Sequence, residues 1–129
     1  MATMYTPFLN DGNMIKPVIL MDEEKSQVWK QNLVTADQAA IIRDTLRNVV
    51  TEGTAGYAKN APFPISGKTG TAELKLTLDE ENGAENGWFV AYPSEDQDMI
   101  IAMMMEKVQD KGSSALVVEK VTDLMEKLK

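Results

Sequence analysis

The sequence contains no cysteine and no histidine among its 129 residues. These absences exclude disulfide bonds, a thiol nucleophile, Cys/His zinc sites and catalytic triads built on histidine. The longest apolar run, residues 99–105, is far shorter than the ~20 residues that a membrane-spanning helix requires. Clusters of positive charge are also missing, because 13 basic residues are interspersed with 20 acidic ones. We therefore expect no nucleic-acid partner and no membrane contact by this segment.

The composition is that of a soluble globular protein, with 43% hydrophobic and 26% charged residues. The length predicts one domain or part of one. The opening stretch, MATMYTPFLNDG, indicates the last turns of a helix that ends near Asn10 and Gly12. No capped beginning precedes it, so we expect the chain to be a fragment that opens in the middle of an element.

Two elements are predicted in the next 40 residues. Apolar stretches at residues 18–21 and 28–29 flank an acidic turn and indicate a short peripheral hairpin. Residues 35–53 predict a helix, with a capping box formed by Thr35 and Gln38 and a stop at Gly53. One face of this central helix is apolar and consists of Ile42, Leu46, Val49 and Val50.

The remainder predicts a sheet and a final helix. Residues 54–64 indicate a loop with prolines that block regular structure, followed by a strand over 65–76 and an acidic turn over 77–87. A second strand covers 88–93, in which alternation directs either Trp88 or Phe89 into the core. A third covers 98–108, where apolar residues on both faces predict a central, buried strand. The last helix is expected to have a serine cap and an apolar stripe formed by Val117, Val121, Leu124 and Leu128. The fold class is therefore α+β, an antiparallel sheet packed against the C-terminal helix and the central capped helix.

The segment SGKT, residues 66–69, raises the question of a nucleotide site. A phosphate-binding loop requires G-x-x-x-x-G-K-[ST] between a strand and a helix. The first glycine position is occupied by Pro62, and Pro64 removes another backbone N–H. The threonine-rich segment that follows is poor helix material. These features argue against a nucleotide site.

The overlapping segment KTGT, residues 68–71, fits acyl transfer. Lys68 can supply a positive charge beside a nucleophile, and the hydroxyls of Thr69 and Thr71 share one face of a strand. Gly70 leaves the strand surface bare, which allows a peptide backbone to approach. The N–H of Thr71 can serve as one oxyanion-hole donor.

Three segments in this order carry a resemblance to a known family: GKTGTAELK (67–75), GWFVAY (87–92) and VQDKG (108–112). The chain resembles the C-terminal part of the transpeptidase domain of class B penicillin-binding proteins, and is most similar to the low-affinity, methicillin-resistance-like branch. The resemblance spans essentially residues 1–129. It implies part of a penicillin-binding-protein/serine β-lactamase-like fold.

The resemblance also implies an activity, the cross-linking of peptidoglycan through an acyl-serine, without metal or cofactor. The partners would be a D-Ala-D-Ala stem peptide or a β-lactam, together with the missing N-terminal part of the domain. Lys68 would be catalytic, and Thr69, Gly70 and Thr71 would bind substrate. The parent protein would be anchored at the extracytoplasmic face of a bacterial membrane.

Two of the three motifs that this family uses, S-x-x-K and S-x-N, are absent from the sequence. None of the serines begins either motif: Ser26, Ser66, Ser94, Ser113 and Ser114. We therefore expect the chain alone to be inactive, because it has no nucleophile. The alternative is a stand-alone, non-catalytic binding or oligomerisation module that retains a remnant of the fold. Taken residue by residue, the plain alternatives are a solvated lysine at Lys68 and β-propensity alone at Thr69 and Thr71.

Overall fold

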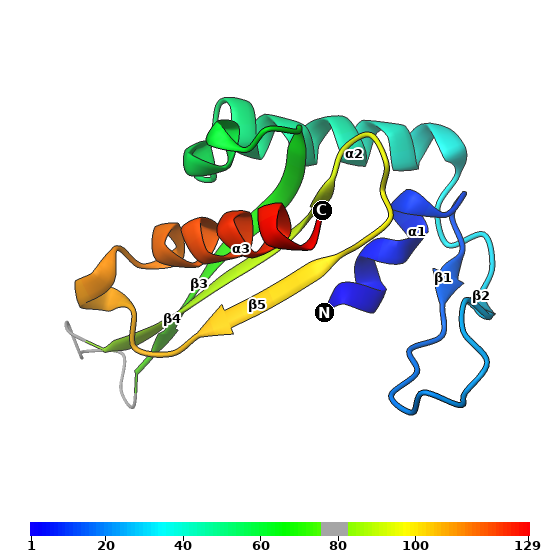
Figure 1. Ribbon diagram of the computed structural model, residues 1–129, viewed down its shortest axis with the longest axis horizontal. Helices are drawn as coiled ribbons and strands as arrows, with labels where there is room; N and C mark the ends of the chain where they lie inside the picture. The colour runs from blue at the N-terminus through cyan, green and yellow to red at the C-terminus, as the bar shows by residue number, and fades with distance from the viewer. Residues whose placement is uncertain (76–82) are drawn as a thin grey trace. The chain divides into compact units, whose positions relative to one another are not determined.

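The computed structural model describes residues 1–75 and 83–129 (Figure 1). Contacts divide the chain into two compact units, residues 1–45 and 46–129. Within the described part of the chain, no helix has the length and apolar character needed to cross a membrane.

The first unit begins with two short helical turns, η1 (Ala2–Tyr5) and α1 (Thr6–Leu9). The Gly12 N–H donates to the Pro7 carbonyl at 2.9 Å, and Gly12 has a positive φ of 81°, which a glycine adopts without strain. The predicted helix end near Asn10 and Gly12 is confirmed.

The hairpin is confirmed, but its first strand lies elsewhere. Strands β1 (Met14–Ile15) and β2 (Val28–Lys30) pair antiparallel, whereas residues 18–21 form no strand. Pro17 has no N–H to donate. The Glu23 carboxylate accepts the N–H groups of Ile19 and Leu20 at 3.1 and 3.2 Å, which lowers the pKa of Glu23. These bonds form a turn, and the apolar side chains at its tip are exposed.

Helix α2 (Ala36–Thr51) begins at the predicted capping box. The Gln38 N–H donates to the Thr35 hydroxyl at 3.2 Å, and the Thr35 N–H donates to the Gln38 side-chain oxygen at 2.9 Å. On the expected apolar face, Leu46 and Val50 are buried.

Replacing Thr35 by alanine should cost about 1 kcal/mol of unfolding free energy, because the orphan N–H of Gln38 loses its acceptor. Thr45→Ala is the matched control, since the Thr45 hydroxyl bonds only to the Ile41 carbonyl within the same helix, and alanine is a better helix former. Urea unfolding measures both variants. An equal effect of the two substitutions would contradict the capping role.

The second unit contains a three-stranded antiparallel sheet in the order β3-β4-β5. Strands β3 (Ile65–Leu74) and β4 (Ala84–Pro93) pair along their whole length, and β5 (Ile101–Met105) pairs with β4 from Gly87 to Ala91. The prediction of a central third strand is wrong for this chain, because β4 lies between the other two. As a result, β5 is half-buried, with Ala102 and Met104 exposed on one face.

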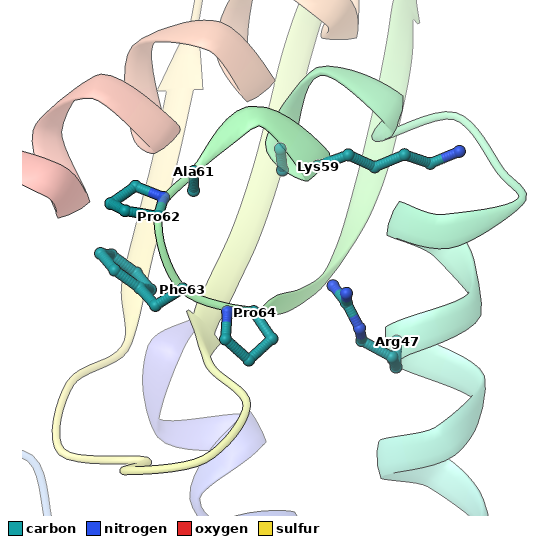
Figure 2. A pocket seen from close by; sticks show the side chains of 7 residues that line it. Arg47, Lys59, Ala61, Pro62, Phe63 and Pro64 are labelled. Carbon is teal, nitrogen blue, oxygen red and sulfur yellow. The ribbon is translucent and has the colours of Figure 1, made fainter.

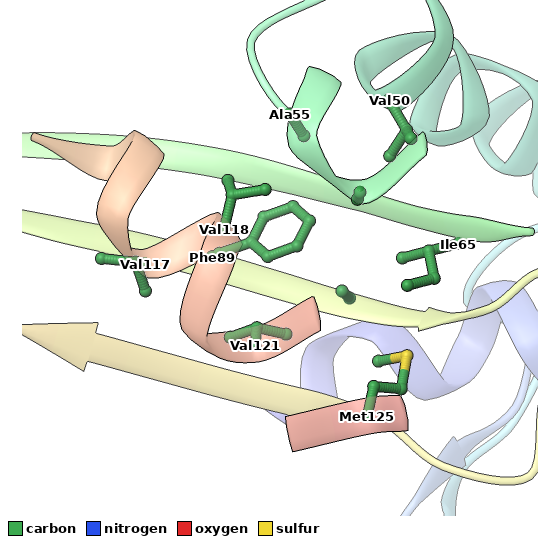
Figure 3. Close-up of a cluster of buried hydrophobic side chains, with 10 residues drawn as sticks. Val50, Ala55, Ile65, Phe89, Val117, Val118, Val121 and Met125 are labelled. Atoms are coloured by element: carbon green, nitrogen blue, oxygen red, sulfur yellow. The ribbon is translucent and has the colours of Figure 1, made fainter. Parts of the chain in front are cut away.

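The core lies on one face of this sheet, where Val50, Ile65 and Phe89 converge with side chains of the last helix (Figure 3). Phe89 is fully buried and Trp88 is half-buried, which confirms that alternation turns one of this pair inward. Helix α3 (Ser114–Leu128) runs across the sheet (Figure 1). It contributes the buried side chains of Val117, Val118, Val121, Thr122 and Met125.

Two predictions for α3 need correction. Leu124 and Leu128 are exposed, because the buried arc of the helix is centred on Val121 and Met125. Ser113 does not cap the helix through its side chain; it has a φ of 56°, and its hydroxyl donates to the Glu85 carboxylate.

The connections also differ in part from the prediction. The loop before β3 contains a 3-10 helix, η2 (Gly56–Asn60), which forms because both prolines lie after it. Another 3-10 turn, η3 (Gln109–Lys111), precedes α3. Strand β4 begins at Ala84, earlier than predicted, since Ala84 still pairs with Leu74. The expected strand end at Leu76 and most of the acidic turn lie outside the described residues.

Candidate functional site

The segment predicted to carry chemistry, residues 68–71, lies in the middle of β3. Thr69 is opposite Phe89 and Thr71 is opposite Gly87, whereas Lys68 is opposite Val90 and Gly70 is opposite Trp88. Because directly paired residues lie on the same face of a sheet, Thr69 and Thr71 share one face, as predicted, and this is the face that carries the core. Lys68 and Gly70 lie on the other face.

The backbone groups of β3 alternate between the neighbouring strand and a free edge. The Ser94 N–H donates to the Pro64 carbonyl at 2.8 Å, so even-numbered residues of β3 direct their backbone groups toward β4. Odd-numbered residues direct their backbone groups away from β4, to the other edge of β3, and no strand of the described residues covers that edge. Two hydrogen bonds agree with this direction: the Ile65 carbonyl accepts from Arg47 at 2.6 Å, and the Thr69 carbonyl accepts from Lys68 Nζ at 2.8 Å. The N–H of Thr71 therefore points out of the open edge.

The two glycines of the segment have different surroundings. A Cβ at Gly67 would lie 2.5 Å from the Val90 carbonyl oxygen and 2.8 Å from the Phe89 ring, so the fold requires glycine there. Among the described residues, a Cβ at Gly70 would meet only the Cβ of Trp88, at an ordinary 3.5 Å. Packing within the described ranges, 1–75 and 83–129, therefore does not explain why residue 70 is glycine.

The Thr69 hydroxyl has a partner that the sequence did not indicate. Thr69 is 7% exposed, and its Oγ1 lies 2.5 Å from Oγ1 of Thr54. Thr54 belongs to the loop after α2, and no motif in the sequence links it to a strand 15 residues further on. Thr71 and Lys68, by contrast, are exposed.

Arg47 lies beside the beginning of β3 and lines a pocket of about 260 Å³ (Figure 2). The side chain extends from α2 toward Pro64, where the strand begins, and donates to the Ile65 carbonyl. The pocket is lined by residues that precede β3, including Lys59 and Phe63, and not by residues 68–71. It is therefore separate from the candidate site.

Comparison with known proteins defines the family. The family model "Penicillin binding protein transpeptidase domain" matches residues 1–126. The chain therefore belongs to the penicillin-binding protein transpeptidase domain family, which confirms the resemblance seen in the sequence.

Among curated relatives, "Penicillin-binding protein 3" of Bacillus subtilis is 44% identical over 123 residues, which are 93% of this chain and 18% of that protein. "Stage V sporulation protein D" of the same organism is 28% identical over 110 residues, covering 81% of this chain and 16% of that protein. The chain thus spans less than a fifth of the length of these relatives.

Solved structures agree with the predicted fold class. The D,D-transpeptidase domain of a peptidoglycan glycosyltransferase from Eggerthella lenta is 28% identical, with a TM-score of 0.71, over 96% of this chain and 31% of that one. The apo transpeptidase domain of Burkholderia pseudomallei penicillin-binding protein 3 has a TM-score of 0.74 over 99% of this chain and 41% of that one. Its identity is 22%, so it supports the fold alone. The low-affinity branch and the roles of individual residues stay predictions.

Proposed function

We propose that this chain forms one wall of a serine D,D-transpeptidase site, and that an N-terminal part of the same domain brings the S-x-x-K and S-x-N motifs. The observation that carries this proposal is the open edge of β3 beside Gly70. The edge offers the Thr71 N–H to a ligand, and the bare glycine leaves room for the ligand backbone.

Each residue has a distinct role in this proposal. Lys68 supplies positive charge beside the nucleophilic serine and orients the ligand carboxylate. Thr69 and Thr71 donate their hydroxyl hydrogens to that carboxylate, which can only accept. The Thr71 N–H stabilises the oxyanion that develops when the serine attacks the carbonyl.

In the reaction that we propose, the serine oxygen attacks the amide between the two D-alanines of a stem peptide. The terminal D-alanine leaves as an amine, which takes up a proton, and the peptide remains as an acyl-serine. The amine of a second stem peptide then displaces the serine and forms the cross-link. A β-lactam mimics the dipeptide and acylates the same serine. This chemistry belongs at the extracytoplasmic face of the membrane, where we place the anchored parent protein.

The test is covalent labelling with a fluorescent penicillin, followed by a denaturing gel. We expect the full-length protein to be labelled and the chain of residues 1–129 alone to remain unlabelled, because it has no S-x-x-K serine. Labelling of the isolated chain would contradict the assignment of the nucleophile. A full-length protein that is not labelled would contradict the proposed function and favour a binding module.

A further inference from the structure

The hydroxyl pair formed by Thr54 and Thr69 joins the loop after α2 to the candidate site. The next residue, Ala55, is fully buried, and its N–H donates to the Val49 carbonyl at 3.0 Å. Thr54 therefore follows the helix end at a fixed position. The separation of 2.5 Å between the two Oγ1 atoms is at the short end of the range for a hydroxyl hydrogen bond.

The direction of this hydrogen bond decides what Thr69 can do. A threonine hydroxyl has one hydrogen to donate and two lone pairs that accept, and either oxygen of the pair can be the donor. If Thr69 donates to Thr54, it has no hydrogen left for a carboxylate. If Thr54 donates, the hydrogen of Thr69 remains available, and the bond that Thr69 accepts makes it a better donor.

We propose that Thr54 is a positioning residue of the transpeptidase site. Its hydroxyl donates to Thr69 Oγ1, which fixes the Thr69 side chain and leaves the Thr69 hydrogen for the carboxylate of the ligand. This inference rests on the proposed function, because it assigns the carboxylate to Thr69. It adds a residue that lies outside the K-[ST]-G segment.

The experiment uses the full-length protein and a β-lactam that carries a carboxylate. Stopped-flow kinetics separate the dissociation constant of the initial complex from the rate constant of acylation. We expect Thr54→Val to weaken the initial complex about fivefold, the effect of one lost hydrogen bond, without changing the acylation rate constant. Thr54→Ser keeps the hydroxyl and should restore binding. Thr54 is exposed, but valine removes the partner of the buried Thr69 hydroxyl, so the melting temperature should fall by a few degrees while the domain remains folded.

A double variant, in which Thr69 is also changed, tests whether Thr54 acts through Thr69. In a Thr69→Val protein, the further change Thr54→Val should have no additional effect on binding. Thr45→Val is the matched control, since it removes an exposed threonine hydroxyl that bonds only within α2.

The outcomes distinguish the two proposals. Wild-type binding by Thr54→Val, or an undiminished loss in the Thr69→Val background, would overturn the positioning role while leaving the proposed function intact. If Thr69→Val does not fold, the comparison of Thr54→Val with Thr54→Ser tests the positioning role. Failure of Thr54→Ser to restore binding would indicate a packing effect and would overturn that role. A full-length protein that is never acylated would overturn the proposed function and this inference with it.

Discussion

Replacing Lys68 by alanine in the full-length protein should lower the second-order rate constant of acylation by a β-lactam by about 100-fold. The expected size is that of removing one group that stabilises charge in a transition state. The fold should be unaffected, because Lys68 is exposed and surface substitutions typically change stability by less than about 0.5 kcal/mol. The measurement is the rate of covalent labelling, with the melting temperature determined in parallel.

Two further variants make the Lys68 test specific. Lys75→Ala removes another lysine near the end of β3, which forms an exposed ion pair with Glu73 at 2.7 Å, and should react at the wild-type rate. Lys68→Arg keeps the charge but changes its geometry, so partial activity is expected. If Lys68→Ala and Lys75→Ala react alike, Lys68 is a solvated lysine and its catalytic assignment is wrong.

Replacing Gly67 by alanine should destabilise the transpeptidase domain by about 1–3 kcal/mol, the usual cost of overpacking. The new methyl group would lie 2.5 Å from the Val90 carbonyl oxygen and 2.8 Å from the Phe89 ring. Both neighbours are held by the sheet or the core, so neither can move without disturbing packing. The midpoint of urea unfolding measures this loss.

Gly70→Ala provides the matched control on the same strand. Its methyl group has ordinary clearance from Trp88, and alanine is favoured over glycine in a strand by about 0.5–1 kcal/mol. Stability should therefore be unchanged or higher, whereas acylation should slow because the methyl group obstructs the approaching ligand. Equal stability of the two variants would show that the contacts around Gly67 relax freely. Undiminished acylation of Gly70→Ala would show that no ligand approaches this glycine closely.

Local rules predicted much of the fold. The capping box at Thr35 and Gln38 depends only on residues three positions apart, and alternation along β3 placed Thr69 and Thr71 on one face. Each of these patterns depends only on residues that are close together in the sequence, so contacts between distant segments do not change what it predicts. The family could be inferred because three motifs occur in the right order between residues 67 and 112.

What the sequence did not predict depends on contacts between distant segments. The hydrophobicity of residues 98–108 indicated burial, but the position of β5 at an edge depends on which strands are present to pair with it. Ser113 looked like a helix cap, yet its hydroxyl binds Glu85 from another element. Thr54 escaped notice for the same reason, since its partner is brought to it only by the fold.

The hydrogen bond from Arg47 to the Ile65 carbonyl has a consequence for ligand length. The odd-numbered residues of β3 present their backbone groups at the open edge, but at Ile65 the carbonyl already has a donor. An added strand that extended past Gly67 toward the beginning of β3 would have to displace this guanidinium, which is restrained by its own helix. A strand that pairs with this edge can therefore extend to Gly67 without displacing Arg47, but not to Ile65. In this way a single arginine of α2 limits the length of strand that the edge can accept.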